Sequence, residues 1–239
     1  MRAFLALTLF LVIAVPANAQ EIAISLGEEN ALTARTLQLI ALITVLSLAP
    51  GLAIMVTCFP FIVTVLSILR QAIGLQQSPP NMLIVSLALF LTYFVMEPVF
   101  TSAWQNGLSP LVEGTMDIGT AFGETMAPFQ IFMGARVDPE TLDAMLDMRA
   151  QSAEISTEET PLSVLVPAFL LSEISRAFQI GFLVFLPFLI IDMVVAAILM
   201  SMGMMMVPPA VVALPFKLAF FVVADGWTLV TSALVRSYF

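Results

Sequence analysis

The chain has 239 residues, of which 60% are hydrophobic and only 10% are charged, and its mean hydropathy is +1.05. Soluble domains are about 45–50% apolar and about 25% charged, so this composition excludes a soluble globular protein and indicates an integral membrane protein. The net charge is −9, and the eight basic residues are scattered singly, without the basic stripe typical of nucleic-acid-binding proteins.

Residue types that carry chemistry are scarce. The chain has no histidine, the usual proton shuttle and the commonest metal ligand, and no phosphate-binding glycine loop. We therefore expect no metal, no cofactor and no enzymatic activity. The single cysteine, Cys58, cannot form an intrachain disulfide, and we expect it to be a small buried hydrophobic residue.

Residues 1–19 have the pattern of a secretory signal peptide. Arg2 precedes an apolar run over residues 3–15, and Ala17 and Ala19 occupy the small-residue positions of a cleavage site. Cleavage after Ala19 starts the mature chain outside the cytoplasm, with residues 20–36 as an exported segment. An uncleaved first membrane span is the alternative, and the shortness of the apolar run argues against it.

Four longer apolar segments follow, over residues 37–69, 82–104, 182–206 and 210–235. Each exceeds the ~20 residues that a helix needs to cross a bilayer, and a chain surrounded by lipid must satisfy its own peptide groups, which favours helices. Pro50, Gly51 and Pro60 predict breaks or kinks in the first segment. The turn at Pro208 and Pro209 is so short that the last two segments must form an antiparallel hairpin. The sequence predicts an all-α membrane protein of long kinked helices and helical hairpins.

Residues 105–165 form an acidic region, in which ten carboxylates face only two arginines between positions 107 and 160. With an exported start, four spans place this region in the periplasm and the short loop that contains Arg70 in the cytoplasm. Within the acidic region, the sequence Asp138-Pro139-Glu140 predicts the start of an amphipathic helix.

Ionisable residues inside apolar segments are costly in a membrane and are therefore candidates for function. Glu173 and Arg176 stand three residues apart, close enough on a helix to pair with each other. Alternatively, one or both contact a partner subunit. Asp192 has no basic residue within five positions, which makes Lys217 in the next segment its natural partner. Measured along the helix axes from the turn, the positions of Asp192 and Lys217 differ by ~7 Å. A long lysine side chain spans this offset, so the two pair within the hairpin or between subunits.

The charged, apolar stretch 166–206 ends in a methionine-rich loop, after which residues 207–239 form the last helix of the hairpin. Five of the seven residues from Met200 to Met206 are methionine, a flexible and polarizable side chain that adapts to irregular shapes. One interpretation is that these methionines fill a core. The other follows from their place at a hairpin tip: the methionines of several copies close a pore with an apolar seal that gates by dewetting.

Four blocks of sequence together resemble the FliP family of type III secretion export-gate proteins. They are residues 70–81, 166–182, 187–209 and 214–217. The first block is a loop whose glycine and paired prolines predict a stiff turn and an extended entry into the next helix; its matching residues include Arg70, Gly74, Gln76, Pro79, Pro80 and Asn81. The signal peptide resembles flagellar members of the family more than injectisome members.

The resemblance implies a homopentamer that joins FliQ, FliR and other export-apparatus membrane proteins in a helical, cone-like oligomer at the flagellar basal body. It implies a location in the bacterial inner membrane, with much of the assembly on the periplasmic side, so that many apolar segments pack on other subunits instead of lipid. The family's methionine gasket maps onto Met204, Met205 and Met206.

We therefore expect a structural subunit of the flagellar protein export channel, through which unfolded flagellar proteins pass. The rival hypothesis is a small-solute or proton-coupled transporter that uses Glu173 and Asp192 as a carboxylate relay. An intramembrane enzyme is disfavoured by the lack of histidine and of a plausible nucleophile–base pair.

Overall fold

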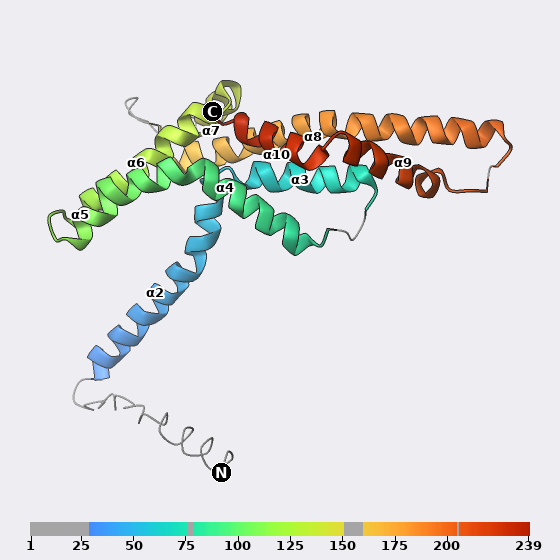
Figure 1. Cartoon of the computed structure of the whole chain (residues 1–239). Helices are drawn as coiled ribbons and strands as arrows, with labels where there is room; N and C mark the ends of the chain where they lie inside the picture. Colours follow the sequence, from blue (N-terminus) through green and yellow to red (C-terminus); the bar gives the residue numbers. More distant parts are fainter. Residues whose placement is uncertain (1–28, 76–78, 151–159, 205) are drawn as a thin grey trace, which may run out of the picture. The chain divides into compact units, whose positions relative to one another are not determined.

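Helices make up every regular element in the part of the chain that the structure describes. A computed structural model describes residues 29–75, 79–150, 160–204 and 206–239. The elements in chain order are α2 (Glu29–Met55), α3 (Phe59–Ile73), α4 (Asn81–Ala103), the π-helix η1 (Trp104–Leu108), α5 (Ser109–Val112), α6 (Ile118–Arg136), α7 (Pro139–Ala150), α8 (Leu162–Ser201), α9 (Pro209–Val223) and α10 (Gly226–Arg236) (Figure 1). The all-α prediction is confirmed. The predicted signal peptide, with Ala17 and Ala19, lies outside the described residues.

Three stretches of helix are long and apolar enough to cross a membrane: Arg35–Met55 within α2, Asn81–Val112 from α4 through α5, and α8. Helices α9 and α10 would add a fourth span if counted together, but a bend of 61° separates them. The apolar segment noted at 182–206 is therefore mostly the second half of one 40-residue helix. The chain is an integral membrane protein.

The first break in the helices falls next to Pro60, one of the two positions that the prolines predict, and not at Pro50 and Gly51. Helix α2 continues through Pro50 and Gly51 and ends at Met55, and α3 begins at Phe59. Pro60 lies in the first turn of α3, where a missing backbone N–H costs nothing because that donor has no partner within the helix. Pro60 thus helps to start a helix instead of kinking one.

The chain divides into two compact units, residues 1–47 and 48–239. The described part of the first unit is a stretch of α2. Apart from Arg2 of the predicted signal peptide, the second unit holds the charged residues and the methionines that the sequence singles out.

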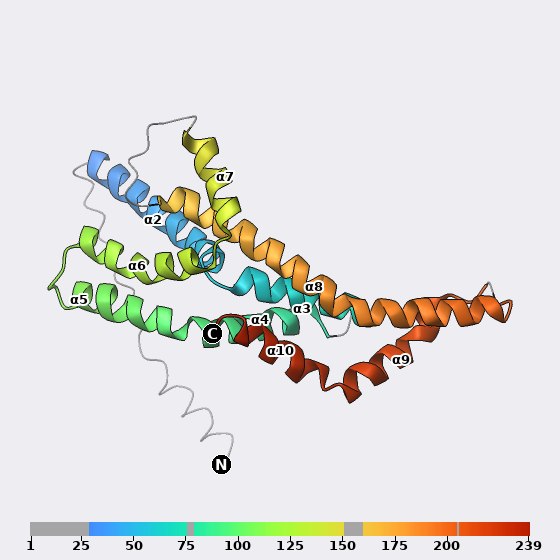
Figure 2. The same ribbon diagram turned by 90° about the horizontal axis from the view of Figure 1, so that it is seen from above.

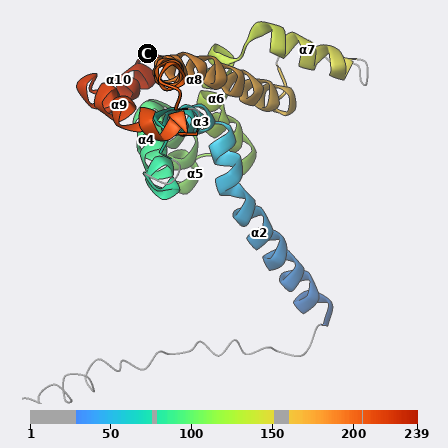
Figure 3. The same ribbon diagram turned by 90° about the vertical axis from the view of Figure 1, so that its right-hand side faces the viewer.

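Helix α3 lies at the centre of the second unit, against α4, α8 and α9 (Figure 3). It is apolar on most of its surface, as a helix surrounded by others must be. Its buried residues are Phe61, Ile62, Val65, Leu66, Leu69, Ala72 and Ile73. Helix α8 approaches it closely because Gly181 has no side chain: a Cβ there would lie 2.4 Å from Cδ1 of Ile68. This contact fixes α8 along α3.

The acidic region folds as helices α5, α6 and α7, with α6 against α4 and η1, and α7 against α8. Helix α7 begins at Pro139, as predicted, because Asp138 caps it. The backbone N–H and the hydroxyl of Thr141 donate to Oδ2 of Asp138 at 3.0 and 2.8 Å. The hydroxyl first, and then the N–H, lower the pKa of the Asp138 carboxyl, because both bonds stabilise its charged form.

Helix α9 returns beside α8 from the tip of the hairpin, as Figure 2 shows, and α10 continues the return (Figure 2). The tip turns at Gly203, whose φ of 74° is readily adopted only by glycine. At the bend between α9 and α10, Asp225 has φ 47°. Next to it, Gly226 makes room for Phe221, since a Cβ on Gly226 would lie 2.2 Å from the phenyl ring.

Candidate functional site

Lys217 joins three elements at the base of the α8–α9 hairpin. Its Nζ lies 2.5 Å from Oδ2 of Asp192 on α8, and it donates a second hydrogen bond of 3.0 Å to the carbonyl of Ala72 near the end of α3. Carbonyls at a helix C-terminus attract a cation. The side chain of Lys217 is only 6% exposed, and that of Asp192 is 31% exposed. The structure thus brings this pair together within one chain.

The loop that follows α3 contacts the same site. Gly74 ends α3 with a φ of 88°, and a Cβ there would lie 3.5 Å from Leu214 and 4.0 Å from Nζ of Lys217. In the last turn of α3, the guanidinium of Arg70 donates to the carbonyl of Pro79 and to the side chain of Asn81, at the far end of the loop. These bonds join the beginning of the loop to its end.

Two other residues of the loop are placed differently. Pro80 is exposed and immediately precedes α4, with an extended backbone. Gln76 lies outside the described residues.

Glu173 is fully buried and has three partners. Arg176, the partner that the sequence suggests, lies 3.5 Å away, but Arg136 of α6 is closer, with Nη2 at 3.1 Å and Nε at 3.2 Å from the same carboxylate oxygen. The hydroxyl of Tyr238 donates to the other oxygen. Both ion pairs form within the chain, so Glu173 needs no partner subunit to compensate its charge.

Sequence reasoning missed Arg136 and Tyr238 as members of this cluster. Tyr238 lies edge-on to Phe61 at 5.6 Å and stacks on Phe132 at 6.1 Å, and the guanidinium of Arg136 sits 4.0 Å above its ring. Burial, and then the charge of Glu173, raise the pKa of the Tyr238 hydroxyl, which therefore stays protonated and donates. The one signal in the sequence is an arginine that directly follows the apolar stretch 131–135.

The two carboxylates of α8 belong to separate clusters. Glu173 and Asp192 are nineteen positions apart on one continuous helix, which corresponds to ~28 Å along its axis. Direct proton transfer between them is therefore excluded. Each is instead held by its own cations, which favours a structural role.

Cys58 is fully buried, as predicted for a small hydrophobic residue. Burial raises the pKa of its thiol to about 12, so the reactive thiolate is suppressed at neutral pH. Among the residues that the structure describes, no three histidine, cysteine or acidic side chains gather as a metal site requires.

The methionines at the hairpin tip fill no core within this chain. The exposed fractions are 61% for Met200, 67% for Met202, 43% for Met204 and 98% for Met206. Met205 lies outside the described residues. An exposed group of large apolar side chains at a helix–helix turn is typical of an interaction surface.

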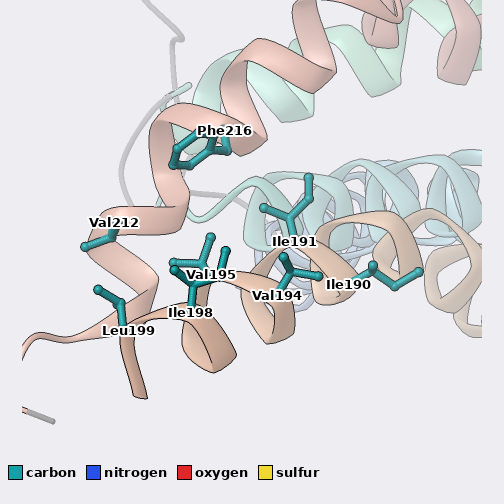
Figure 4. A pocket seen from close by; sticks show the side chains of 8 residues that line it. All are labelled: Ile190, Ile191, Val194, Val195, Ile198, Leu199, Val212 and Phe216. Atoms are coloured by element: carbon teal, nitrogen blue, oxygen red, sulfur yellow. The ribbon is translucent and has the colours of Figure 1, made fainter. Parts of the chain in front are cut away.

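An apolar groove runs along the hairpin toward these methionines. It encloses about 400 Å³, and Figure 4 shows Val212 and Phe216 of α9 facing Ile191, Val195 and Leu199 of α8 across it. Every side chain that lines the groove is apolar, Ile190, Val194 and Ile198 included. Such a groove accepts an apolar side chain or helix and offers nothing to a polar small molecule.

A buried charge network, a methionine-tipped hairpin and helices of membrane length are thus present in one chain. Residues 42–234 match the model of the FliP family. The chain belongs to the FliP family. The resemblance drawn from the four sequence blocks is confirmed.

Similar proteins carry the same family name. The chain is 52% identical over 215 residues to the flagellar biosynthetic protein FliP of Caulobacter vibrioides, a match that covers 90% of this chain and 81% of that protein. It is 43% identical over 238 residues to the FliP of Agrobacterium fabrum, with 97% of both chains covered. It is 44% identical over 203 residues to the FliP of Bacillus subtilis, with 85% of this chain and 92% of that protein covered.

Proposed function

We propose that this chain is a structural, non-enzymatic subunit of the flagellar type III protein export channel. Membership of the FliP family and the flagellar names of its relatives support this role. In the proposal, five copies assemble with FliQ and FliR into a cone-like oligomer that encloses a closed passage. Unfolded flagellar proteins cross the membrane through that passage.

The observation that carries the proposal is the exposed methionine tip of the α8–α9 hairpin. Met204 and Met206, which follow the end of α8, are exposed. They lie next to an apolar groove that no other part of the described chain covers. When several copies meet around an axis, flexible thioethers pack into a narrow apolar ring from which water is expelled, so ions do not pass. The same flexibility lets the ring conform to polypeptides of varied sequence.

The proposed location is the inner membrane at the flagellar basal body, with much of the assembly on the periplasmic side. The membrane-length helices support the membrane location. The expected signal peptide supports the periplasmic side, because an exported start of the mature chain followed by two spans places region 105–165 outside the cytoplasm.

Conductance tests the proposed seal. The complex, expressed with its partners in a bacterial membrane, is compared with the triple variant Met204→Ala, Met205→Ala and Met206→Ala. We expect the variant to leak small ions. Alanine is shorter than methionine, so the ring of side chains is wider and no longer excludes water. Cell growth and the current through single complexes in a planar bilayer report the leak.

Met193→Ala is the matched control, since Met193 is also exposed on α8, at 63%, but lies about two turns before the tip. This variant should not leak. If the triple variant conducts no more than the control in complexes of equal abundance, the methionine seal is wrong.

A further inference from the structure

Helix α4 carries one charged residue, Glu97, in the middle of an exposed apolar face. The face includes Leu83, Phe90 and Phe94, with exposed fractions of 60%, 74% and 61%, and continues to Trp104 at 55%. These positions recur at intervals of three, four and seven residues, the spacing of one helix face. Glu97 is exposed on it. The opposite face, with Ala88, Val95 and others, is buried against the rest of the unit.

Glu97 lacks the compensation that the other carboxylates of the long helices have. In the described ranges, its side chain takes part in none of the recorded ion pairs or hydrogen bonds, whereas Glu173 and Asp192 each have a basic partner. Glu97 nevertheless belongs to the stretch Asn81–Val112, which is long and apolar enough to cross a membrane. A carboxylate on the outer face of such a helix is costly against lipid, and a cation that covers it lowers this cost.

Pro98 adds a second acceptor at the same level. Proline has no N–H, so the carbonyl of Phe94, four residues earlier, lacks the donor that a regular helix supplies. Phe94 and Pro98 are both exposed, which puts this carbonyl on the same outer side as Glu97. A carboxylate and a carbonyl on the same side of one helix suit a guanidinium, whose several N–H donors lie in one plane.

The chain itself carries such a guanidinium. Arg236, in the last turn of α10, is exposed, and no ion pair or side-chain hydrogen bond is recorded for it among the described residues. Arg35 is the other exposed arginine of this kind, but it belongs to the first unit. Helix α10 packs against α4, yet Arg236 and Glu97 of one chain form no ion pair. Because each copy has one of each, a closed ring of copies leaves neither charge unpaired.

We propose that the outer face of α4 is covered by a second copy of this chain, whose Arg236 pairs with Glu97. The inference rests on the proposed oligomeric channel and identifies one of its interfaces. Burial of Phe90, Phe94 and Trp104 supplies the apolar contact, and the ion pair sets the register between copies.

Charge exchange tests the pair in the full complex. Glu97→Arg and Arg236→Glu should each lower the yield of assembled complex roughly tenfold or more, because each places like charges opposite one another. The double exchange should restore assembly to near the wild-type yield. Glu97→Arg with Arg35→Glu is the matched control and should restore nothing; recovery in this control alone would overturn the assignment of Arg236.

Disulfide trapping gives a second, independent readout. In a Cys58→Ala background, Glu97→Cys with Arg236→Cys should give covalent dimers of this chain on mild oxidation. Glu97→Cys with Asp143→Cys, an exposed acid on α7, should not. Cross-links to a companion protein instead of a second copy would overturn the proposal.

Glu97→Leu separates a protein-covered face from a lipid-covered one. A lipid-facing helix gains from this change, whereas the proposed interface loses its ion pair and yields less complex. The mass of the wild-type assembly distinguishes the failure of the oligomeric channel from the failure of the Glu97 interface. If the complex holds several copies but shows neither rescue by charge exchange nor disulfide trapping, only the Glu97 interface is wrong. If the wild-type chain is monomeric, the oligomeric channel is wrong as well.

Discussion

At the scale of single residues, the chain compensates each charge in α8 with a partner from another element or a nearby turn. Lys217 is the sharpest case, because one ammonium group serves Asp192 and the carbonyl of Ala72 together. An isolated charge in this setting would carry the full cost of desolvation, which usually exceeds the value of the pair itself. The pair therefore matters most when one member is lost.

Removing Asp192 alone should do more harm than removing both charges. Asp192→Ala leaves Lys217 buried without a counter-charge, which costs about 3 kcal/mol, at the low end for buried pairs because Asp192 is partly exposed. The double change with Lys217→Met replaces the ammonium by an apolar side chain of similar length. We expect higher yields of assembled complex and a higher thermal midpoint in detergent for the double variant than for Asp192→Ala.

The double-mutant cycle is the measurement, and its coupling free energy should be at least about 1 kcal/mol. Asp143→Ala, which changes an exposed acid of α7, serves as the control and should behave as wild type. Independent effects of the two changes would mean that the pair contributes nothing to assembly.

At the scale of elements, close approach of helices depends on a few glycines. Gly107 lies in the π-helical turn η1, and a Cβ there would be 2.1 Å from Oγ1, 2.6 Å from N and 2.8 Å from Cα of Thr125 on α6. Two of these atoms are backbone, so no rotation of a side chain relieves the contact. The wider π-helical turn and the glycine together allow α6 to pack against η1.

Gly107→Ala should therefore separate η1 from α6 and destabilise the fold by about 1–3 kcal/mol, the range for overpacked cores. The free energy of unfolding in detergent, or the thermal midpoint, measures the effect. Gly123→Ala in the middle of α6 is the matched control: its Cβ meets nothing within 4 Å, and alanine is the better helix former by about 1 kcal/mol. A Gly107→Ala protein as stable as Gly123→Ala would contradict the close packing.

The elements differ in how far the sequence predicts them. Long apolar runs identify the helices, and the capping sequence at Asp138 identifies the start of α7, because both signals are local. The break between α2 and α3 is predicted correctly near Pro60, but none occurs at Pro50 and Gly51, because proline is compatible with a helix start, a kink or a helix interior and the local sequence does not distinguish them. The pairing of Glu173 with Arg136 and Tyr238 joins residues 37 and 65 positions apart, and no local pattern contains that information. The pair of Asp192 and Lys217 was predictable only because one short turn fixes their levels.

At the scale of the whole molecule, the last residues of the chain tie its helices together. Tyr238 contacts Phe61 of α3, Phe132 and Arg136 of α6, and Glu173 of α8. Arg136 also donates to the carbonyl of Ser237 at 2.8 Å. Three helices that lie far apart in the sequence, α3, α6 and α8, thus meet at one side chain.

Tyr238→Phe should lower the stability of the folded chain by about 1–3 kcal/mol, because a fully buried carboxylate oxygen of Glu173 loses a donor that no water replaces. The thermal midpoint in detergent measures the loss. Tyr93→Phe is the matched control: Tyr93 is the other tyrosine of the chain, and its ring is 63% exposed on α4. Equal midpoints for the two variants would show that the hydroxyl of Tyr238 contributes nothing.

The anchoring of Tyr238 has a consequence for membrane sidedness. Helix α8 leaves the level of Glu173 for the methionine tip, and α9 and α10 come back to that level. Because Arg136 at the end of α6 also donates to the carbonyl of Ser237, we expect residues 237–239 to lie on the same side of the membrane as the α6–α7 boundary. We therefore expect the stretch from α8 to α10 to enter and leave the bilayer through the same surface, and so to add an even number of crossings to the topology.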